Sequence, residues 1–216
     1  GSQFTLGLKI TPPYSLIKGT TDAQYAQMTT SEKYNLLEYH KWKFSGKVFT
    51  PLSADSKLVL MARAEFGYLG HYNKNVKSPF ESYYMGGDGM SSYSSYSTEY
   101  IAMRGYQSGS LTPYDPATGR NMGYVFNKFT MELRYPIALE QNATIWALAF
   151  VEAGNCFADI RDYNPFNLKR SAGIGVRLFL PMFGLMGIDW GWGFDPINGS
   201  TQYGGSQFHF VLGQEL

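Results

Sequence analysis

Apolar and polar side chains alternate with a period of two along several stretches of the chain. The clearest stretch is 126–135, where Phe129 and Leu133 fall on one face and Lys128 and Glu132 on the other. Successive side chains of a β-strand point to opposite faces, so this stretch predicts a strand with one apolar and one charged face. A face with charges at this spacing does not fit the core of a two-sheet sandwich. It is typical of a membrane barrel, whose apolar face contacts lipid while its polar face lines a lumen.

The same alternation recurs along the chain and predicts eight strands, each of about the length that crosses a bilayer at a tilt. The predicted strands span residues 3–12, 38–51, 57–68, 126–135, 143–155, 168–180, 185–195 and 206–216. The apolar face is predicted to contact lipid, with Phe129, Leu133, Ile174, Trp190 and Phe208, and the polar face to line the lumen, with Lys128, Glu132, Arg177 and Asp189. The fifth strand is apolar on both faces, and Glu152 indicates which face is turned to the lumen.

The predicted connections alternate between two lengths. Three are turns of a few residues, whereas the long ones cover about 13–37, 69–121, 156–167 and 196–205. Membrane barrels combine short periplasmic turns with long extracellular loops in this way. We therefore predict a single all-β domain over 1–216, an antiparallel transmembrane β-barrel of eight strands.

Composition agrees with a membrane barrel and excludes several other classes. Aromatic residues make up 17% and charged residues 16% of the chain, which suits a lipid-facing band bounded by aromatic girdles. No apolar run approaches the roughly 18 residues that a membrane helix needs. The net charge of +1 gives no reason to expect a nucleic acid partner. His40, His71 and His209 lack metal-ligand spacing and no G-x-S-x-G motif occurs, so we expect no metal, no cofactor and no enzyme activity.

The predicted loop 69–121 is too long to be a simple connection, and loops of this size are usually functional or disordered. It contains two short motifs, Tyr84-Met85-Gly86-Gly87 and Met103-Arg104-Gly105-Tyr106. The second predicted strand after the loop, 143–155, contains Phe150-Val151-Glu152-Ala153-Gly154. This order of motifs resembles the BamA-like barrel-assembly superfamily: an aromatic-x-Gly-Gly segment, then an Arg-Gly-aromatic segment, then a Phe-x-acid-x-Gly strand.

The resemblance implies a specific contact inside the barrel. In that superfamily the Arg-Gly-aromatic tip folds back into the lumen, where the Arg meets a carboxylate of the Phe-x-Asp-x-Gly strand. Here Arg104 would meet Glu152, between Phe150 and Gly154. A guanidinium in a lumen is costly unless it is paired, and a carboxylate is its best partner. The spacing between Gly87 and Arg104 is longer than usual in the superfamily, so a different loop path is also open.

The C-terminal segment supports the same resemblance. The segment resembles the terminal β-signal of outer-membrane barrels, which has outward aromatic residues two apart on the last strand. The residues that would form this signal are Phe208, Phe210, Leu212, Gly213 and Leu216. The superfamily usually ends in Phe or Trp, and Leu216 departs from that pattern. The resemblance covers the last eight strands of a sixteen-stranded barrel, so we expect a fragment without POTRA domains.

The function implied by the resemblance is folding and insertion of β-barrel proteins into the outer membrane of a Gram-negative bacterium, by strand pairing at a lateral seam. The implied partners are the lipid bilayer, unfolded outer-membrane client proteins and the lipoproteins of the assembly complex. The truncated chain could itself be inactive. Two alternatives stay open: a passive structural barrel or narrow pore, whose inward charges pair with one another, and a protein-secretion pore of the same superfamily.

The sequence also raises the question of how the sheet ends. An open strand edge in lipid leaves backbone groups without hydrogen bonds, at several kcal/mol each. We expect 3–12 to close onto 206–216 within one chain, because this closure needs no partner. The alternative is a sixteen-stranded dimer of two chains joined edge to edge.

Overall fold

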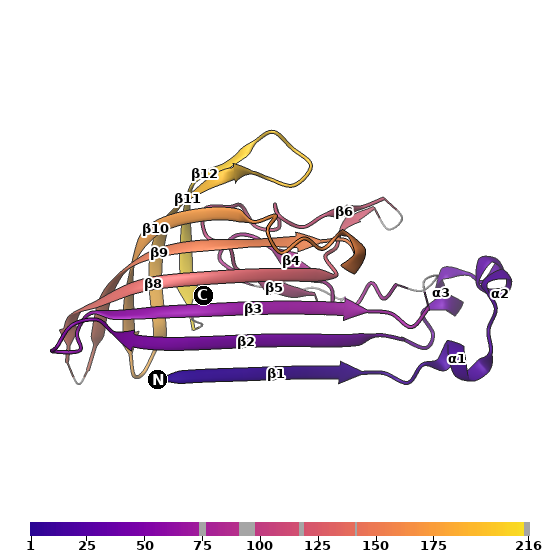
Figure 1. The fold of residues 1–216 in the computed structure, drawn as a ribbon, viewed down its shortest axis with the longest axis horizontal. Coiled ribbons are helices and arrows are strands. Elements are labelled where there is room, and N and C mark those ends of the chain that lie inside the picture. Colours follow the sequence, from indigo (N-terminus) through magenta and orange to yellow (C-terminus); the bar gives the residue numbers. More distant parts are fainter. Residues whose placement is uncertain (74–76, 91–97, 117–118, 141, 214–216) are drawn as a thin grey trace.

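The computed structural model describes residues 1–73, 77–90, 98–116, 119–140 and 142–213. Its main feature is one sheet of eight strands in the order β1-β2-β3-β8-β9-β10-β11-β12, with every neighbouring pair antiparallel. The strands of this sheet are β1 (Ser2–Ile10), β2 (His40–Pro51), β3 (Val59–Gly70), β8 (Val125–Leu139), β9 (Thr144–Phe157), β10 (Lys169–Leu180), β11 (Gly184–Pro196) and β12 (Tyr203–Leu212). The sheet curls into an open half-barrel (Figure 1). The eight predicted strands are therefore confirmed.

The two faces of the sheet differ as the alternation predicts. The residues predicted to face lipid are exposed on the outer face, namely Phe129, Leu133, Ile174, Trp190 and Phe208. The residues predicted to face the lumen are buried on the inner face, namely Lys128, Glu132, Arg177 and Asp189. On β9 the face that carries Glu152 is the buried one, so that assignment is also confirmed.

Two strands have boundaries that differ from the prediction by more than two residues. β8 continues four residues beyond the predicted end, through a register shift between Pro136 and Ala138. A bulge is one of the places where a sheet tolerates proline, which donates no ladder hydrogen bond. β12 begins three residues earlier than predicted and ends at Leu212; the last predicted residues, 214–216, lie outside the described residues.

The predicted closure of 3–12 onto 206–216 is wrong. Within the described residues, β1 pairs with β2 alone and β12 pairs with β11 alone, and all nine residues of β1 are exposed. The reason is the long loop between β3 and β8, which places fully buried side chains such as Arg104 and Tyr106 on the inner face. An eight-stranded barrel encloses only enough space for its own inward side chains. The sheet therefore stays open around the loop.

The connections alternate in length as predicted, but the long ones contain structure that the pattern does not indicate. Between β1 and β2 lie three short helices, α1 (Tyr14–Lys18), α2 (Asp22–Gln27) and α3 (Thr30–Lys33), which project beyond the strand ends (Figure 1). The β3–β8 loop holds the parallel pair β4 (Tyr83–Met85) and β5 (Glu99–Ile101), and the antiparallel pair β6 (Tyr114–Asp115) and β7 (Arg120–Asn121). A 3₁₀ turn, η1 (Ile160–Asp162), follows β9. No helix within the described ranges has the length and apolar character needed to span a membrane.

The hydrophobic core lies between this loop and the inner face of the sheet. Its buried members come from the loop and from β3, β8 and β9, and they are Leu69, Tyr83, Met85, Ile101, Met103, Tyr106, Leu111, Met122, Tyr124, Phe126 and Cys156. The ring of Tyr83 packs edge-on against that of Phe126, with 4.7 Å between ring centroids. This core holds the rest of the loop in a defined place over the sheet.

Candidate functional site

The two loop motifs form one structural unit. The amide of Met103 donates to the carbonyl of Gly87, and the amide of Gly87 donates to the carbonyl of Tyr106, both at 3.0 Å. Gly87 has φ +76, a conformation that glycine adopts without strain. A Cβ on Gly86 would lie 2.3 Å from the carbonyl oxygen of Gln107. The long spacing between the motifs, part of which lies outside the described residues, therefore does not separate them in space.

Arg104 lies at the centre of a pocket of carboxylates and is fully buried. Its Nη2 donates to Glu132 Oε1 at 2.6 Å and to Glu152 Oε1 at 2.8 Å. Its Nη1 donates to Asp189 Oδ2 at 3.3 Å, and its backbone amide donates to Glu152 Oε2 at 2.9 Å. The guanidinium carbon lies 3.6 Å from the centroid of the Phe150 ring. The structure thus places Arg104 against Glu152 and Phe150, and adds two carboxylates.

Each carboxylate of the pocket has a second cation from the sheet. Arg177 holds both oxygens of Asp189 at 2.7 Å, Lys128 lies 3.1 Å from Glu152, and Arg134 lies 2.6 Å from Glu132. The three carboxylates therefore face four cations, Arg104 included. A buried ion pair that loses one partner leaves a desolvated charge, so the geometry of this network is strongly constrained.

The loop tip rests on a floor of glycines. Gly105 has φ +83, and a Cβ there would lie 2.7 Å from the amide nitrogen of Gly193. In the opposite direction, a Cβ on Gly191 would lie 2.8 Å from the amide nitrogen of Gly105. A Cβ on Gly204 would lie 2.5 Å from the Gly105 carbonyl oxygen. The tip backbone can approach β11 and β12 this closely only because these positions lack side chains.

Three hydrogen bonds, made by the Tyr106 hydroxyl and the Gly105 amide, fix the tip on the sheet. The Tyr106 hydroxyl donates to the carbonyl of Arg170 at 2.9 Å and accepts from the amide of Asp195 at 3.3 Å. The Gly105 amide donates to Nε2 of His209 at 2.8 Å. The tip is thereby joined to β10, β11 and β12 as well as to β8 and β9.

The remaining candidate residues lie in two different places. Gly154 faces the loop, where a Cβ would lie 2.8 Å from Cε of Met85. The outward residues of the terminal strand take no part in the pocket, and they are Phe208, Phe210 and Leu212, all exposed. Gly213 ends the strand at φ +71, with its amide 2.7 Å from the carbonyl of Leu185. Leu216 lies outside the described residues.

A second group of ion pairs attaches the loop to the N-terminal strands. Nζ of Lys41 lies 3.0 Å from Glu81 and 2.9 Å from Glu99. Lys9 lies 3.0 Å from Glu81, and Lys43 pairs with Glu99. Burial raises the pKa of both glutamic acids, but the lysines outweigh that effect, so each pKa is lowered below its ordinary value of 4.5.

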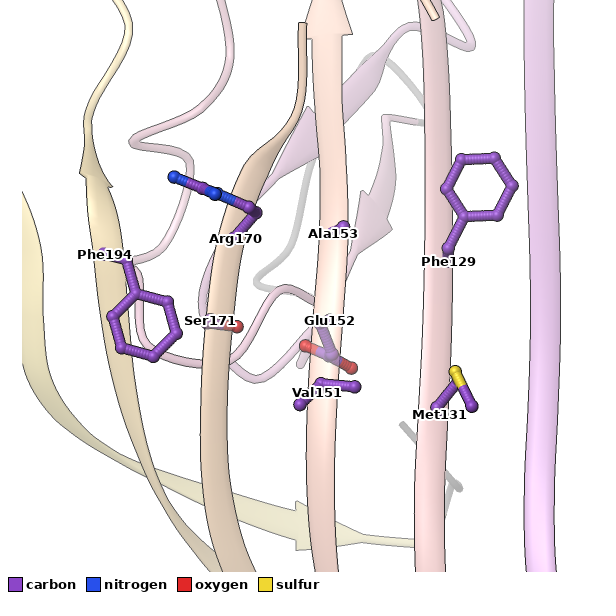
Figure 2. Close-up of a pocket in the computed structure, with 8 residues that line it drawn as sticks. All are labelled: Phe129, Met131, Val151, Glu152, Ala153, Arg170, Ser171 and Phe194. Atoms are coloured by element: carbon purple, nitrogen blue, oxygen red, sulfur yellow. The ribbon is translucent and has the colours of Figure 1, made fainter. Parts of the chain in front are cut away.

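The outer face of the sheet carries an apolar groove with a cavity volume of about 450 Å³ (Figure 2). The small side chain of Ala153 lies between Phe129 of β8 and Phe194 of β11, with Met131 and Val151 below. A groove of this composition on the outer face suits contact with lipid chains. In the part of the chain that the structure describes, no three or more His, Cys, Asp or Glu residues are grouped so that they could hold a metal ion.

Comparison with known proteins identifies the family. The model of the Omp85 superfamily domain matches residues 19–216. This chain belongs to the Omp85 superfamily. Among solved structures it is similar to that described as BamA from Haemophilus ducreyi lacking POTRA domains 1–3, with a TM-score of 0.62 and 19% identity. The match covers 98% of this chain and 38% of the other, so this Omp85 chain spans well under half of that protein and the likeness concerns the fold. No curated protein matches it.

Four features of the Omp85 pocket were not among the candidate residues predicted from sequence. Glu132 and Asp189 were predicted only to face the lumen, and His209 was considered only as a metal ligand. The glycine floor went unrecognised. Glycines at alternate inward positions of one strand, Gly187, Gly191 and Gly193, are a signal of close backbone approach that could have identified it.

Proposed function

We propose that this chain is the strand-accepting part of an outer-membrane barrel that folds and inserts client β-barrel proteins. The observation that carries the proposal is β12, which has one strand neighbour in the described sheet and whose outward residues Phe208, Phe210 and Leu212 are exposed. An incoming strand cannot leave its backbone N–H and C=O groups unpaired in hydrocarbon. Addition to the edge of β12 would supply those hydrogen bonds.

The two faces of the sheet support a membrane location for this reaction. The outer face is apolar and the inner face holds buried ion pairs, the arrangement expected of an outer-membrane barrel wall. The partners of the proposed activity are the lipid bilayer and unfolded outer-membrane proteins. Lipoprotein subunits of an assembly complex remain a prediction from the family resemblance.

A narrow pore or a secretion pore has less support from the same residues. Both pores need an open path along the inner face. Here the loop covers that face, and Arg104 and its carboxylate partners are buried there. The proposed mechanism needs no covalent chemistry, only strand pairing at the edge of β12.

Reconstitution with site-specific crosslinking tests the proposal. The chain is placed in liposomes with a photo-crosslinking residue at Phe210 of β12, and a urea-unfolded eight-stranded client barrel is added. The matched control places the same residue at Ile174 of β10, which is similarly exposed on the outer face but has strand neighbours on both sides. We expect client adducts at position 210 and faster client folding than in empty liposomes. Equal adducts at both positions, or no acceleration, would contradict the proposal.

A further inference from the structure

The loop tip is hydrogen-bonded to the strand at the edge of the sheet through one imidazole ring. His209 lies on β12, directly opposite Asp189 of β11 in the strand register. Its side chain points to the inner face, where the residue is 4% exposed, and Nε2 accepts the hydrogen bond from the Gly105 amide at 2.8 Å. Arg104, the residue before, contacts β8, β9 and β11 instead. The hydrogen bond to His209 therefore attaches the tip to the edge strand as well.

The packing around this hydrogen bond leaves little freedom for the tip. Gly105 lies against Gly204 of β12 and Gly193 of β11, at distances where neither could carry a Cβ without a shift. β12 has no second strand neighbour in the described sheet to hold it in place. Its position relative to β11 therefore depends on the ladder with β11 and on contacts from the inner side. The hydrogen bond to the tip is one of those contacts.

The protonation state of the ring decides whether the hydrogen bond can form. Nε2 accepts from a backbone amide only when it carries a lone pair, which requires the neutral ring with its proton on Nδ1. An imidazolium has a donor on each nitrogen and would face the Gly105 N–H with a second N–H. The charged groups that act electrostatically on the ring are Asp88 and Arg104 of the loop, Glu152 of β9 and Asp189 of β11.

We propose that His209 is a positioning residue that couples the loop tip to the edge strand, so that loss of its acceptor nitrogen releases β12 from the tip. The inference rests on the proposed function only where it concerns client strands, because β12 is the edge to which they would add. The coupling itself concerns this chain alone. The Arg-Gly-Tyr tip thus has a second role besides pairing with Glu152: it stabilises the position of the edge strand β12 in the sheet.

Amide hydrogen exchange of the full chain in liposomes, without client, tests the coupling. His209→Phe keeps a ring of similar size and removes the acceptor, whereas His209→Gln offers an amide oxygen in its place. We expect exchange across residues 203–212 to be about tenfold faster in the Phe variant, the effect of losing one buried hydrogen bond. The Gln variant should stay close to the wild type. Gln207→Leu, on the same strand and the same face, is the matched control. It removes a hydrogen bond within β12, from Nε2 to the Gly204 carbonyl, but leaves the contact with the tip intact, so it should change exchange far less than His209→Phe.

A pH series distinguishes the acceptor role of His209 from a purely structural role, because packing alone would not make exchange of β12 depend on the protonation of the ring. After correction for intrinsic exchange rates, exchange of β12 in the wild type should accelerate toward the acid end of a series from pH 8 to pH 4, where the ring takes up a proton, while both His209 variants should show no such step. Exchange in β9 should stay unchanged throughout. Three outcomes would overturn the proposal. The first is exchange of β12 in the Phe variant at the wild-type rate, and the second is equally accelerated exchange in the Phe and Gln variants. The third is exchange that accelerates equally in β9 and β12. Client crosslinking at position 210 is measured separately, so its failure would remove the proposed function and leave the coupling standing.

Discussion

Arg104 and Glu152 contact each other twice, through the two ends of the arginine. Nη2 of the guanidinium lies 2.8 Å from Oε1, and the backbone amide lies 2.9 Å from Oε2 of the same carboxylate. The carboxylate therefore fixes both the side chain and the local backbone of the loop tip. A lysine at this position could replace the charge but not the forked geometry of the guanidinium.

Removing Arg104 should destabilise the folded chain substantially. Three buried carboxylates lose their shared cation in Arg104→Ala, although Lys128, Arg134 and Arg177 remain beside them. We expect the free energy of unfolding to fall by about 3 kcal/mol, the lower end for a broken buried ion pair. Urea unfolding in detergent micelles, followed by tryptophan fluorescence, measures the change.

A double-mutant cycle with Glu152→Gln isolates the pairing. The two substitutions together should cost less than the sum of their separate effects, because each removes the partner that the other leaves behind. Arg170→Ala serves as the control, since Arg170 pairs with Asp195 at a solvent-exposed position and its loss should leave the unfolding midpoint near that of the wild type. Simple additivity of Arg104→Ala and Glu152→Gln would show that the contact carries no energy.

Adding one methyl group at the tip should displace it from the sheet. Gly105→Ala combines a left-handed backbone conformation with a Cβ 2.7 Å from the amide of Gly193. Gly199→Ala has a similar φ of +74 with open space around its Cβ, so it carries the conformational cost alone, about 1–2 kcal/mol. We expect the Gly105 variant to lose clearly more stability in the same unfolding measurement. Equal losses would mean that the glycine floor does not constrain the tip.

The four tryptophans should report the sidedness of the sheet. Trp42, Trp190 and Trp192 are exposed on the outer face, whereas Trp146 lies on the face of β9 that carries Leu148, Phe150 and Glu152. In liposomes with brominated acyl chains, single-tryptophan variants retaining an outer residue should be strongly quenched, because bromine quenches on contact. The variant retaining Trp146 should keep most of its fluorescence. Strong quenching of Trp146 would reverse the assignment of the two faces.

Acid should loosen the attachment of the loop to the first strands. The folded-state pKa values of Glu81 and Glu99 are lowered by their lysine partners, so the ionised forms stabilise the folded chain. That stability is fully present above the ordinary glutamic acid pKa and is lost as the pH falls through the lowered folded-state values. Thermal unfolding midpoints measured from pH 7 downward should therefore fall more in the wild type than in Glu81→Gln/Glu99→Gln. Parallel pH curves for the two proteins would contradict this assignment.

The strands of this fold could be predicted from the sequence because a strand between lipid and a polar interior repeats the same two-residue pattern. That pattern reports the environment of each side chain and contains no information about how far the sheet curls. Closure depended on the space taken by the β3–β8 loop, which no local pattern measures. The helices between β1 and β2 had a local signal: the side chain of Thr21 caps the amide of Gln24, and Thr29 and Glu32 make the same reciprocal contact.

The pocket could be predicted only in part, for a related reason. The resemblance connected Arg104 with one strand, and the structure brings them together. Glu132 and Asp189 were visible as inward charges, yet the alternation does not say which inward charges meet. Their pairing follows from the register of β8, β9 and β11. The row of paired residues that contains Glu132 passes through Phe150 and Gly191, and Glu152 and Asp189 each lie two residues from that row, on opposite sides of it. His209 joins them because β12 continues that register.

The position of Arg104 in the chain also sets an order of events during folding. The arginine is synthesised before β8, β9 and β11, which carry its carboxylate partners. His209, which binds the neighbouring Gly105, follows Gly105 by 104 residues. Contacts of such long sequence separation form only after the entropy of closing the intervening chain has been overcome. The loop tip therefore cannot settle until the final hairpin has arrived, and arrival of the hairpin completes its charge pairing. Docking of the tip is thus a late step that distinguishes a finished sheet from an unfinished one.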